Sequence, residues 1–390
     1  MQNNPDIIVA GHICLDIIPG LQNLDIQKPE DFFVPGKLVE SSPATVSTGG
    51  CVSNTGLGLV KIGVQTALMG KVGDDSFGRI VRMIINDGFD VIGGMIVDKT
   101  AVTSHTTVLS PKGYDRMFLH CPGANDTFCK DDIDFSLVKK AKHFHFGYPP
   151  LMKKMYVNGG EELINIFKSA KECGVTTSLD MALPDPDSES GKVNWLNILR
   201  KVLPYVDIYL PSAEEILFMT DKNKFDKYHA KADKDPIDLF TGDDLHEISS
   251  ILLNFGAKII VIKCGHRGSY LRAANKNALS EIQQDFLNVD DWAERELWKP
   301  AFKIDVPPNT TGSGDATIAG FLAAYLKGCS AQEAITYANA IGACSVTKPG
   351  ALAGIIPWSE LVNRVAAGWQ SAELEIEGNG WEKAGSIWKK

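Results

Sequence analysis

Short apolar runs alternate with longer segments of helical periodicity along most of the chain. The runs lie at residues 6–10, 143–146, 175–179, 206–210 and 258–262, and all but the first follow an amphipathic stretch. Buried strands separated by helices are typical of βα units on a parallel sheet covered on both faces. The pattern therefore predicts an α/β fold with a doubly wound, mostly parallel sheet flanked by helices.

One region departs from this alternation. Residues 91–97, 102–109 and 116–121 are strand-like, with a turn at 111–113, and no helical period fits between them. We expect these strands to join the segment after the first strand in a small β-sheet lid, built from about residues 12–48 and 91–124.

The rest of the chain divides by composition. The main domain is expected to span residues 1–365. Residues 221–243 and 273–300 carry many charged or polar residues without a clean apolar period, and we expect them to be insertions outside the core. The C-terminal tail, 366–390, either packs back on the surface or is partly disordered.

Composition and charge exclude several classes of protein. The 390 residues are 44% hydrophobic and 22% charged, as in a soluble globular protein with a large core. A net charge of -9 without a basic run argues against nucleic-acid binding. No secretory signal and no apolar stretch of about 20 residues is present, so we expect a cytoplasmic protein without a membrane span. Eight cysteines without a C-x-x-C pair predict reduced thiols and disfavour a Cys/His metal site.

The sharpest chemical feature is the string N-T-T-G-S-G-D at residues 309–315, which leads into an almost wholly apolar stretch ending at Gly328. That stretch predicts a buried helix. A glycine-rich turn at a buried helix N-terminus presents unpaired N–H groups and the positive end of the helix dipole. The string therefore predicts an anion site, whereas Asp315 alone could simply be a favourable charge in the first turn.

A second glycine-rich string, T-G-G-C-V-S-N-T-G at residues 48–56, leads into another helix. Asn54 lies on a helix otherwise turned to the core, and a buried amide requires hydrogen-bond partners that a polyhydroxylated ligand could supply. Asp16 follows the first strand and is either a turn residue or a ligand contact. Ligands bind at the carboxyl ends of the strands in doubly wound sheets, so the position of Asp16 favours a ligand contact over a turn residue.

Together these strings resemble a known family. G-G-x-x-x-N with G-D-D-x-F-G near the start, and T-T-G-S-G-D-A near the end, are similar to the two signatures of the ribokinase (PfkB) family of carbohydrate kinases. Their order and spacing match over about residues 6–357. The resemblance implies an ATP-dependent kinase that phosphorylates a hydroxyl of a sugar or sugar-like alcohol, with a β lid that often serves as a homodimer interface.

The resemblance also implies roles for individual residues. Asp315 falls at the catalytic base, and the N–H groups of Gly312, Ser313 and Gly314 fall at the anion hole. Phosphoryl transfer needs positioning and charge stabilisation more than covalent help, and an aspartate can accept the proton of the attacking hydroxyl. The positions that contact the sugar in the family are Asp16, Gly49, Gly50 and Asn54.

On the nucleotide side, Ser212 and Glu215 resemble the family's N-x-x-E, with serine where asparagine is usual. Glu215 is implied to place Mg²⁺ through water, although an exposed glutamate at a helix start would look the same in sequence. Lys263 stands where the family's T-x-G-x-x-G has threonine. It could reach a phosphate as a point charge, or be a solvated lysine on a turn. The other implied nucleotide contacts are Gly265, Gly268, Thr311 and Asn339.

Many relatives hold a monovalent cation beside the anion hole. The positions that match this site are Asn309, Thr311, Ser345, Lys348 and Gly350. The family has an aspartate where this chain has Asn309. Because hard cations prefer charged oxygen ligands, K⁺ activation is left open.

Other departures concern the acceptor. Cys14, Cys51 and Gly147 replace the asparagine, lysine and glutamate of ribokinases, so ribose is a doubtful substrate, whereas a hexose, another sugar, an inositol or a nucleoside remains open. The alternatives to a sugar kinase are a nucleoside, inositol or vitamin-precursor kinase of the same fold, or a non-catalytic sugar- or nucleotide-binding regulator. The eight histidines need no special role: His143 and His145 are expected to be structural, whereas His105 and His120, on lid-like strands, could touch the substrate.

Overall fold

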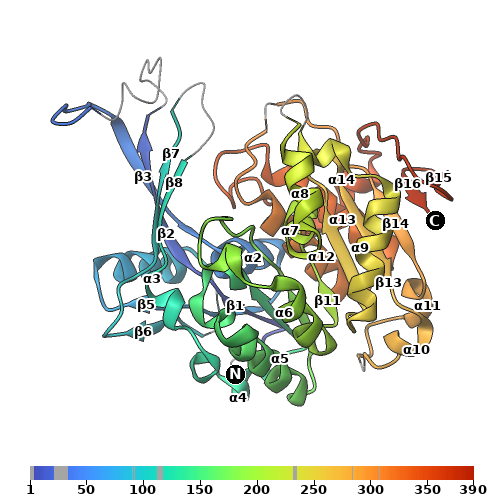
Figure 1. Cartoon of the computed structure of the whole chain (residues 1–390), viewed down its shortest axis with the longest axis horizontal. Helices are drawn as coiled ribbons and strands as arrows, with labels where there is room; N and C mark the ends of the chain where they lie inside the picture. Colours follow the sequence, from blue (N-terminus) through green and yellow to red (C-terminus); the bar gives the residue numbers. More distant parts are fainter. Residues whose placement is uncertain are drawn as a thin grey trace.

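The computed structural model describes residues 4–21, 34–89, 91, 93–111, 117–231, 235–282, 284–306 and 308–390. Within these ranges, a ten-stranded sheet crosses the molecule in the order β15-β16-β14-β13-β12-β11-β10-β9-β1-β4 (Figure 1). The strands are β15 Glu382–Ala384, β16 Ile387–Lys389, β14 Glu296–Lys299, β13 Ser269–Ala273, β12 Ile259–Lys263, β11 Ile208–Tyr209, β10 Thr176–Leu179, β9 His143–Gly147, β1 Ile7–Gly11 and β4 Thr66–Met69.

The strands from β4 to β12 are parallel, and the remainder of the sheet is antiparallel. The predicted apolar runs form β1, β9, β10, β11 and β12, which confirms the expected α/β fold. A strand with both faces buried has no alternation of apolar and polar residues, so these runs are continuous in sequence. In β1, Ile7 and Val9 pack into one core while Ile8 and Ala10 pack into the other.

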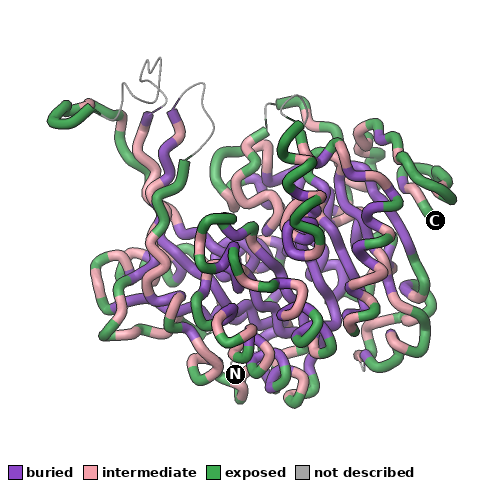
Figure 2. Tube along the Cα trace, in the orientation of Figure 1, coloured by how far each residue is buried: buried purple, intermediate pink, exposed green. Residues whose placement is uncertain are grey.

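Helices cover both faces of this sheet (Figure 1), and most of the chain at the centre of the main domain is buried (Figure 2). The helices are α2 Cys51–Ile62, α3 Ser76–Gly88, α4 Phe135–Val138, α5 Glu161–Glu172, α6 Trp195–Val202, α7 Ala213–Thr220, α8 Lys222–His229, α9 Gly242–Asn254, α10 Lys276–Leu279, α11 Val289–Trp292, α12 Ser313–Leu326, α13 Ala331–Ser345 and α14 Trp358–Ala366. Helices α2, α12 and α13 bury side chains in the first core, and α5, α6, α7 and α9 in the second. The almost wholly apolar α12 lies between α2 and α13, and this position explains why apolar residues surround it.

The lid is a four-stranded sheet that stands off the core (Figure 1). Its strands are β3 Ser42–Gly49, β2 Cys14–Gly20, β7 His105–Leu109 and β8 Met117–Cys121. Residues 22–33 and 112–116, which include most of the expected turn at 111–113, lie outside the described residues. The segment 91–97 differs from the expectation, because β6 Ile96–Asp98 pairs with β5 Lys71–Gly73 in a separate sheet rather than with the lid.

Neither expected insertion lies wholly outside the core. In the first, 221–243, α8 lies on the surface, but Phe225, Ile237 and Phe240 are buried in the second core, and the Phe225 and Phe218 ring centroids are 5.2 Å apart. The second, 273–300, contradicts the prediction that it lies outside the core, because it ends in β14, all four residues of which are buried. Its apolar pattern is interrupted by Glu296 and Lys299, which are buried with polar partners instead of being exposed.

All eight cysteines are free. Among the described residues, no group of three or more histidine, cysteine, aspartate or glutamate side chains could hold a metal ion. In those same ranges, no helix is long and apolar enough to cross a membrane.

Candidate active site

The candidate site lies where parallel strands of the main sheet end. Tyr148 follows β9, Asp180 follows β10, and Lys263 ends β12. Because parallel strands point the same way, these side chains reach one edge of the sheet, where α12 begins. A cleft of about 530 Å³ opens there, and its lining includes all three side chains, Glu215 and residues 312–315.

The glycine-rich turn forms the floor of this cleft. Gly312 caps α12 with φ 70° and ψ 9°, a left-handed conformation that favours glycine. The N–H of Ser313 donates to the Thr310 carbonyl at 3.2 Å, and that of Ala316 donates to the Gly312 carbonyl at 2.9 Å. Gly314 and Asp315 are the second and third residues of α12, so their N–H groups have no acceptor within the helix, and the backbone hydrogen bonds of the described residues include none from either group. One of the three implied anion-hole groups, Ser313 N–H, is therefore already used inside the turn.

Asp315 joins the two glycine-rich strings. Its Oδ2 accepts hydrogen bonds from Asn54 Nδ2 at 3.0 Å and from the Tyr148 hydroxyl at 2.7 Å, and its Oδ1 accepts one from the Thr55 hydroxyl at 3.3 Å. Burial raises the pKa of the Asp315 carboxyl, and these donors act in the opposite direction. The Asn54 Oδ1 is buried without a partner among the described residues. Asp315 and Asn54 thus meet in one buried cluster.

Tyr148 was not identified from the sequence. It lies directly after β9 with φ 65°, a left-handed conformation that is uncommon for a residue other than glycine, asparagine or aspartate. Burial and the adjacent Asp315 raise the pKa of its hydroxyl, which therefore donates rather than ionises. The only sequence signal is the string G-Y-P-P, in which two prolines stiffen the backbone after the strand.

The expected sugar contacts gather between β1, the lid and α2. Burial raises the pKa of Asp16 to about 6, and its carboxylate accepts a bond from the Cys14 thiol at 3.4 Å. A Cβ at Gly49 would collide with the Asp16 carboxylate, so only glycine fits there with Asp16 in this position. At Gly50, with φ 84°, a Cβ would lie 2.5 Å from His12 Nδ1.

His12 lies beside these expected sugar contacts. It is buried, and neither ring nitrogen has a partner in the described residues. Burial lowers the pKa of its imidazole to about 3, which keeps the ring neutral at physiological pH. Its ring centroid lies 5.4 Å from that of His120 and 5.9 Å from that of Tyr148. Buried polar atoms without partners are rare, so His12 is a candidate contact for a hydroxylated ligand.

Lys263 and two acids form the opposite wall. The Lys263 ammonium lies 2.6 Å from Asp180 Oδ1 and donates to the Leu210 carbonyl at 2.7 Å, so it is neither solvated nor exposed. Asp180 Oδ2 has no partner within the ranges described. Burial raises the pKa of the Asp180 carboxyl, and Lys263 opposes this shift. Asp180 was missed in the sequence, although an acid directly after a strand is the same signal that identified Asp16.

Glu215 is only partly exposed. Its Oε2 accepts from the Ser212 backbone N–H at 2.6 Å, while the Ser212 hydroxyl accepts from the Glu215 N–H at 3.2 Å. This capping box begins α7 and fixes Glu215 at the cleft. Burial raises the pKa of its carboxyl.

A second hollow, of about 490 Å³, opens from the same turn. It shares Lys263, Ser313 and Gly314 with the cleft, and Gly265 and Gly268 also line it. Its apolar lining includes Ala301, Phe302, Ile304, Val306, Ala343 and Val346. Asn339 lines it too, but its amide is engaged by the protein: Nδ2 donates to the Lys299 carbonyl at 2.7 Å, and Oδ1 accepts from the Ser269 hydroxyl at 2.6 Å. The cleft and the hollow together place a helix N-terminus beside an apolar lining, which suits a ligand with an anionic group joined to a flat apolar group.

The residues of the implied cation site lie before the turn and around the end of α13. Asn309 N–H donates to the Val346 carbonyl at 2.8 Å, and Asn309 Oδ1 accepts from Thr311 N–H at 3.2 Å. The Lys61 ammonium donates to the Leu352 carbonyl at 2.6 Å. Burial lowers the pKa of Lys61, and the positive charge of Lys348 lowers it further. Ser345 is buried and its hydroxyl donates to the Gly342 carbonyl, while Gly350 has φ 83°.

Comparisons with known proteins identify the family of this chain. The model of the pfkB family carbohydrate kinases matches residues 18–358. The probable chloroplastic fructokinase-6 of Arabidopsis thaliana is 27% identical over 374 residues, covering 93% of this chain and 82% of its own, and fructokinase-2 of Zea mays is 25% identical, covering 89% and 90%.

Solved structures show the same fold. Ribokinase of Arabidopsis thaliana, complexed with ribose and ATP, superposes with a TM-score of 0.69 at 19% identity, covering 92% of this chain and 98% of its own. Fructokinase of Xylella fastidiosa, with bound ATP, gives 0.67 at 16% identity, covering 93% and 99%. With the family model matching most of its length, this chain belongs to the pfkB family of carbohydrate kinases.

Proposed function

We propose that this kinase transfers the γ-phosphoryl group of MgATP to a hydroxyl of a small, uncharged carbohydrate, with Asp315 as the base. The observation that carries the proposal is the position of Asp315. Its carboxylate lies in the first turn of α12, beside the unpaired N–H of Gly314, and is hydrogen-bonded to Asn54 on the acceptor side. A carboxylate there can accept the proton of a hydroxyl that attacks a phosphoryl group held at the helix N-terminus.

The nucleotide fits the two joined hollows. Its base would occupy the apolar hollow beside Phe302. Its phosphates would lie along residues 312–315, where the N–H groups of Gly314 and Asp315 at the N-terminus of α12 and the helix dipole stabilise negative charge. Lys263 reaches the same turn, with its side chain 3.7 Å from the position a Cβ on Gly314 would take. The Lys263 ammonium could leave Asp180 and bind a phosphate oxygen instead. A ribokinase and a fructokinase of the same fold hold bound ATP, which supports ATP as the nucleotide.

Asp180 and Glu215 are the residues that would hold Mg²⁺. Both line the cleft, and the unpartnered Asp180 Oδ2 is a hard oxygen ligand of the kind Mg²⁺ prefers. When bound, the ion would neutralise charge on the phosphate oxygens. A putative ribokinase II of E. coli, in complex with ATP and Mg²⁺, has the same fold, with a TM-score of 0.65. K⁺ dependence, with Asn309 in place of the aspartate, is settled by the assay below.

The acceptor would lie between Asp315, Asp16 and His12. Cys51, which replaces the lysine of ribokinases, is buried, and its thiol faces the Ala10 and His12 carbonyls at 3.6 Å. It therefore adds no charged donor to the acceptor side, which again argues against ribose. The fructokinase relatives make D-fructose the first candidate. The alternative acceptors on this fold are a nucleoside, an inositol or a vitamin precursor. The lid could also serve as a homodimer interface.

ADP release with a matched panel tests the proposal. D-fructose, D-glucose, D-ribose, myo-inositol and adenosine are compared at equal concentration with MgATP, with and without K⁺. We expect acceptor-dependent ADP release, highest kcat/KM for a free sugar, and the lowest sugar value for D-ribose. MgATP binding without ADP release for any acceptor would contradict the proposal and favour the non-catalytic regulator.

A further inference from the structure

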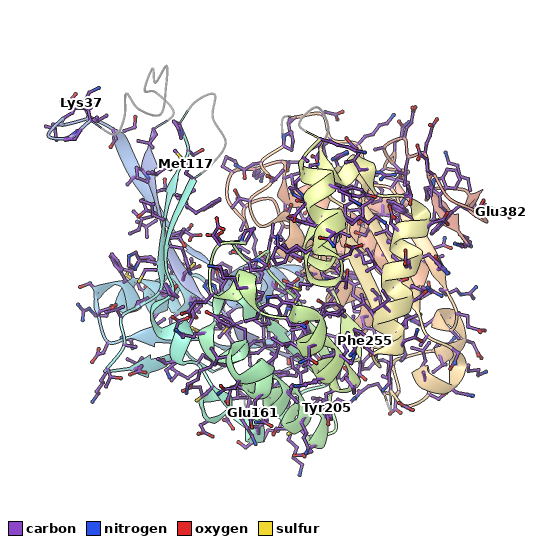
Figure 3. The ribbon with its side chains drawn as sticks, in the orientation of Figure 1. Lys37, Met117, Glu161, Tyr205, Phe255 and Glu382 are labelled. Atoms are coloured by element: carbon purple, nitrogen blue, oxygen red, sulfur yellow. The ribbon has the colours of Figure 1, made fainter. Side chains whose placement is uncertain are left out.

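The chain continues beyond the part that the family model matches, which ends at residue 358. Residues 369–390, here called the C-terminal strap, cross the outer edge of the main sheet and end in β15 and β16 (Figure 1). Figure 3 labels Glu382 in this strap, at the edge of the molecule opposite the lid. Before it reaches β15, the strap passes the apolar hollow, and Ala372 is part of its lining.

Backbone pairing fixes the strap against the wall of this hollow. Lys303 N–H donates to the Gln370 carbonyl at 2.9 Å, and Ala372 N–H donates to the Ala301 carbonyl at 2.7 Å. Ala301, Phe302 and Lys303 all line the hollow. The wall segment 301–303 is therefore paired, on the side of the strap, by residues 370–372.

Aromatic packing supports the same wall. The Trp369 ring stacks on Phe302, with centroids 4.6 Å apart and planes 29° apart, and its Nε1 donates to the Lys303 carbonyl at 2.9 Å. The Arg364 guanidinium lies 3.8 Å from the Trp369 ring centroid. Phe302 is thus held between the hollow and a stacked partner, which restricts its rotamer.

Lys299 ties both ends of the strap to the sheet. Its buried ammonium donates to the Ser371 hydroxyl at 2.7 Å and to the Ser386 carbonyl at 3.0 Å, and it lies 4.7 Å from the Phe302 ring centroid. Farther along, Arg267 Nη2 donates to the Glu375 carbonyl at 3.2 Å. Since Lys299 and Arg267 belong to the family-matched domain, the strap is integrated into the wall at several points.

We propose that the C-terminal strap builds one wall of the nucleotide-base pocket, so that part of the ATP site lies outside the region the family model matches. Ala372 contacts the base edge directly, and its small side chain leaves room for it. Trp369 is a positioning residue that holds Phe302. The proposal rests on the proposed function, because it assigns the apolar hollow to the base of ATP.

Filling the pocket from the strap is the direct test. Ala372→Trp places a bulky ring in the hollow, whereas Ala384→Trp places the same ring on an exposed position of the same strap. For Ala372→Trp we expect the KM for ATP, and the Kd for MgADP by calorimetry, to rise about tenfold or more. The KM for the best acceptor should stay within about twofold, and Ala384→Trp should match the wild type in every constant.

A measurement on the unmodified protein covers the case in which Ala372→Trp does not fold. Amide hydrogen exchange is followed with and without MgADP. We expect slower exchange in peptides covering 300–305 and 369–373, with no change at 382–389. Trp369→Ala should raise the KM for ATP several-fold while leaving the KM for the acceptor unchanged.

The outcomes separate the two proposals. If the wild type releases ADP but Ala372→Trp and Ala384→Trp have equal ATP constants, or MgADP protects neither peptide, the strap proposal is overturned and the kinase proposal stands. If the wild type neither binds MgADP nor releases ADP, both are overturned.

Discussion

Removing the Tyr148 hydroxyl should shift the acid limb of the pH profile of kcat/KM to higher pH. Tyr148→Phe deletes the 2.7 Å hydrogen bond to Asp315 Oδ2 but keeps the ring that lies beside His12. Donors to a carboxylate stabilise its charged form and lower its pKa, so losing one raises the pKa of Asp315. A base must be ionised to accept a proton. Activity is therefore lost at a higher pH in the variant than in the wild type.

The size of the effect follows from the hydrogen bonds of Asp315. A hydrogen bond to a charged group contributes about 1.5–3 kcal/mol, and about 1.4 kcal/mol corresponds to one pKa unit. Asn54 and Thr55 continue to donate to Asp315, so part of the loss is compensated. We expect the acid limb to rise by about one pH unit, with the plateau at high pH within about threefold of wild type.

The assay is kcat/KM for the best acceptor at saturating MgATP, measured from about pH 5 to 9. Tyr156→Phe is the matched control, because it removes a hydroxyl from a ring packed on Trp195 rather than on Asp315. If the two variants have the same acid limb, or if Tyr148→Phe loses activity equally at every pH, Tyr148 does not tune the base.

Two further substitutions test neighbouring parts of the cleft. Lys263→Met removes the partner of the buried Asp180 and should lower the unfolding free energy in urea by about 3 kcal/mol. The Kd for MgADP should rise at least about tenfold. If both values are unchanged, Lys263 contributes neither to stability nor to nucleotide binding. Gly49→Ala places a methyl group against the Asp16 carboxylate and should raise the acceptor KM about tenfold with the KM for ATP unchanged; an unaltered acceptor KM would remove Asp16 from the sugar site.

The parallel half of the fold was predictable because the residues of each strand, taken alone, indicate that it is buried on both faces. A strand buried on both faces must be apolar throughout, and the runs that became β1, β9, β10 and β12 are visible for that reason. The antiparallel edge was not predictable in the same way. In β14, Glu296 is buried because Tyr270 and His246 hydrogen-bond to it, and these partners are distant in sequence.

The candidate site was partly predictable for a related reason. Asp315 and Asn54 lie in glycine-rich strings that have a recognisable form, and the structure brings them within 3.0 Å. Tyr148, Asp180 and His12 are single polar residues after strands, a position that many turn residues share, so their place in the sequence alone does not assign them to a site. What makes them functional candidates is convergence at one sheet edge, which depends on the strand order.

The most direct test of the account is turnover by Asp315→Asn. The amide keeps the shape of the side chain but cannot accept the proton of the attacking hydroxyl. At saturating MgATP and acceptor, we predict that the rate of ADP release falls about a thousandfold or more, while the Kd for MgADP stays within about threefold of wild type. A variant that binds MgADP normally and still turns over within tenfold of wild type would contradict the assignment of Asp315 as the base.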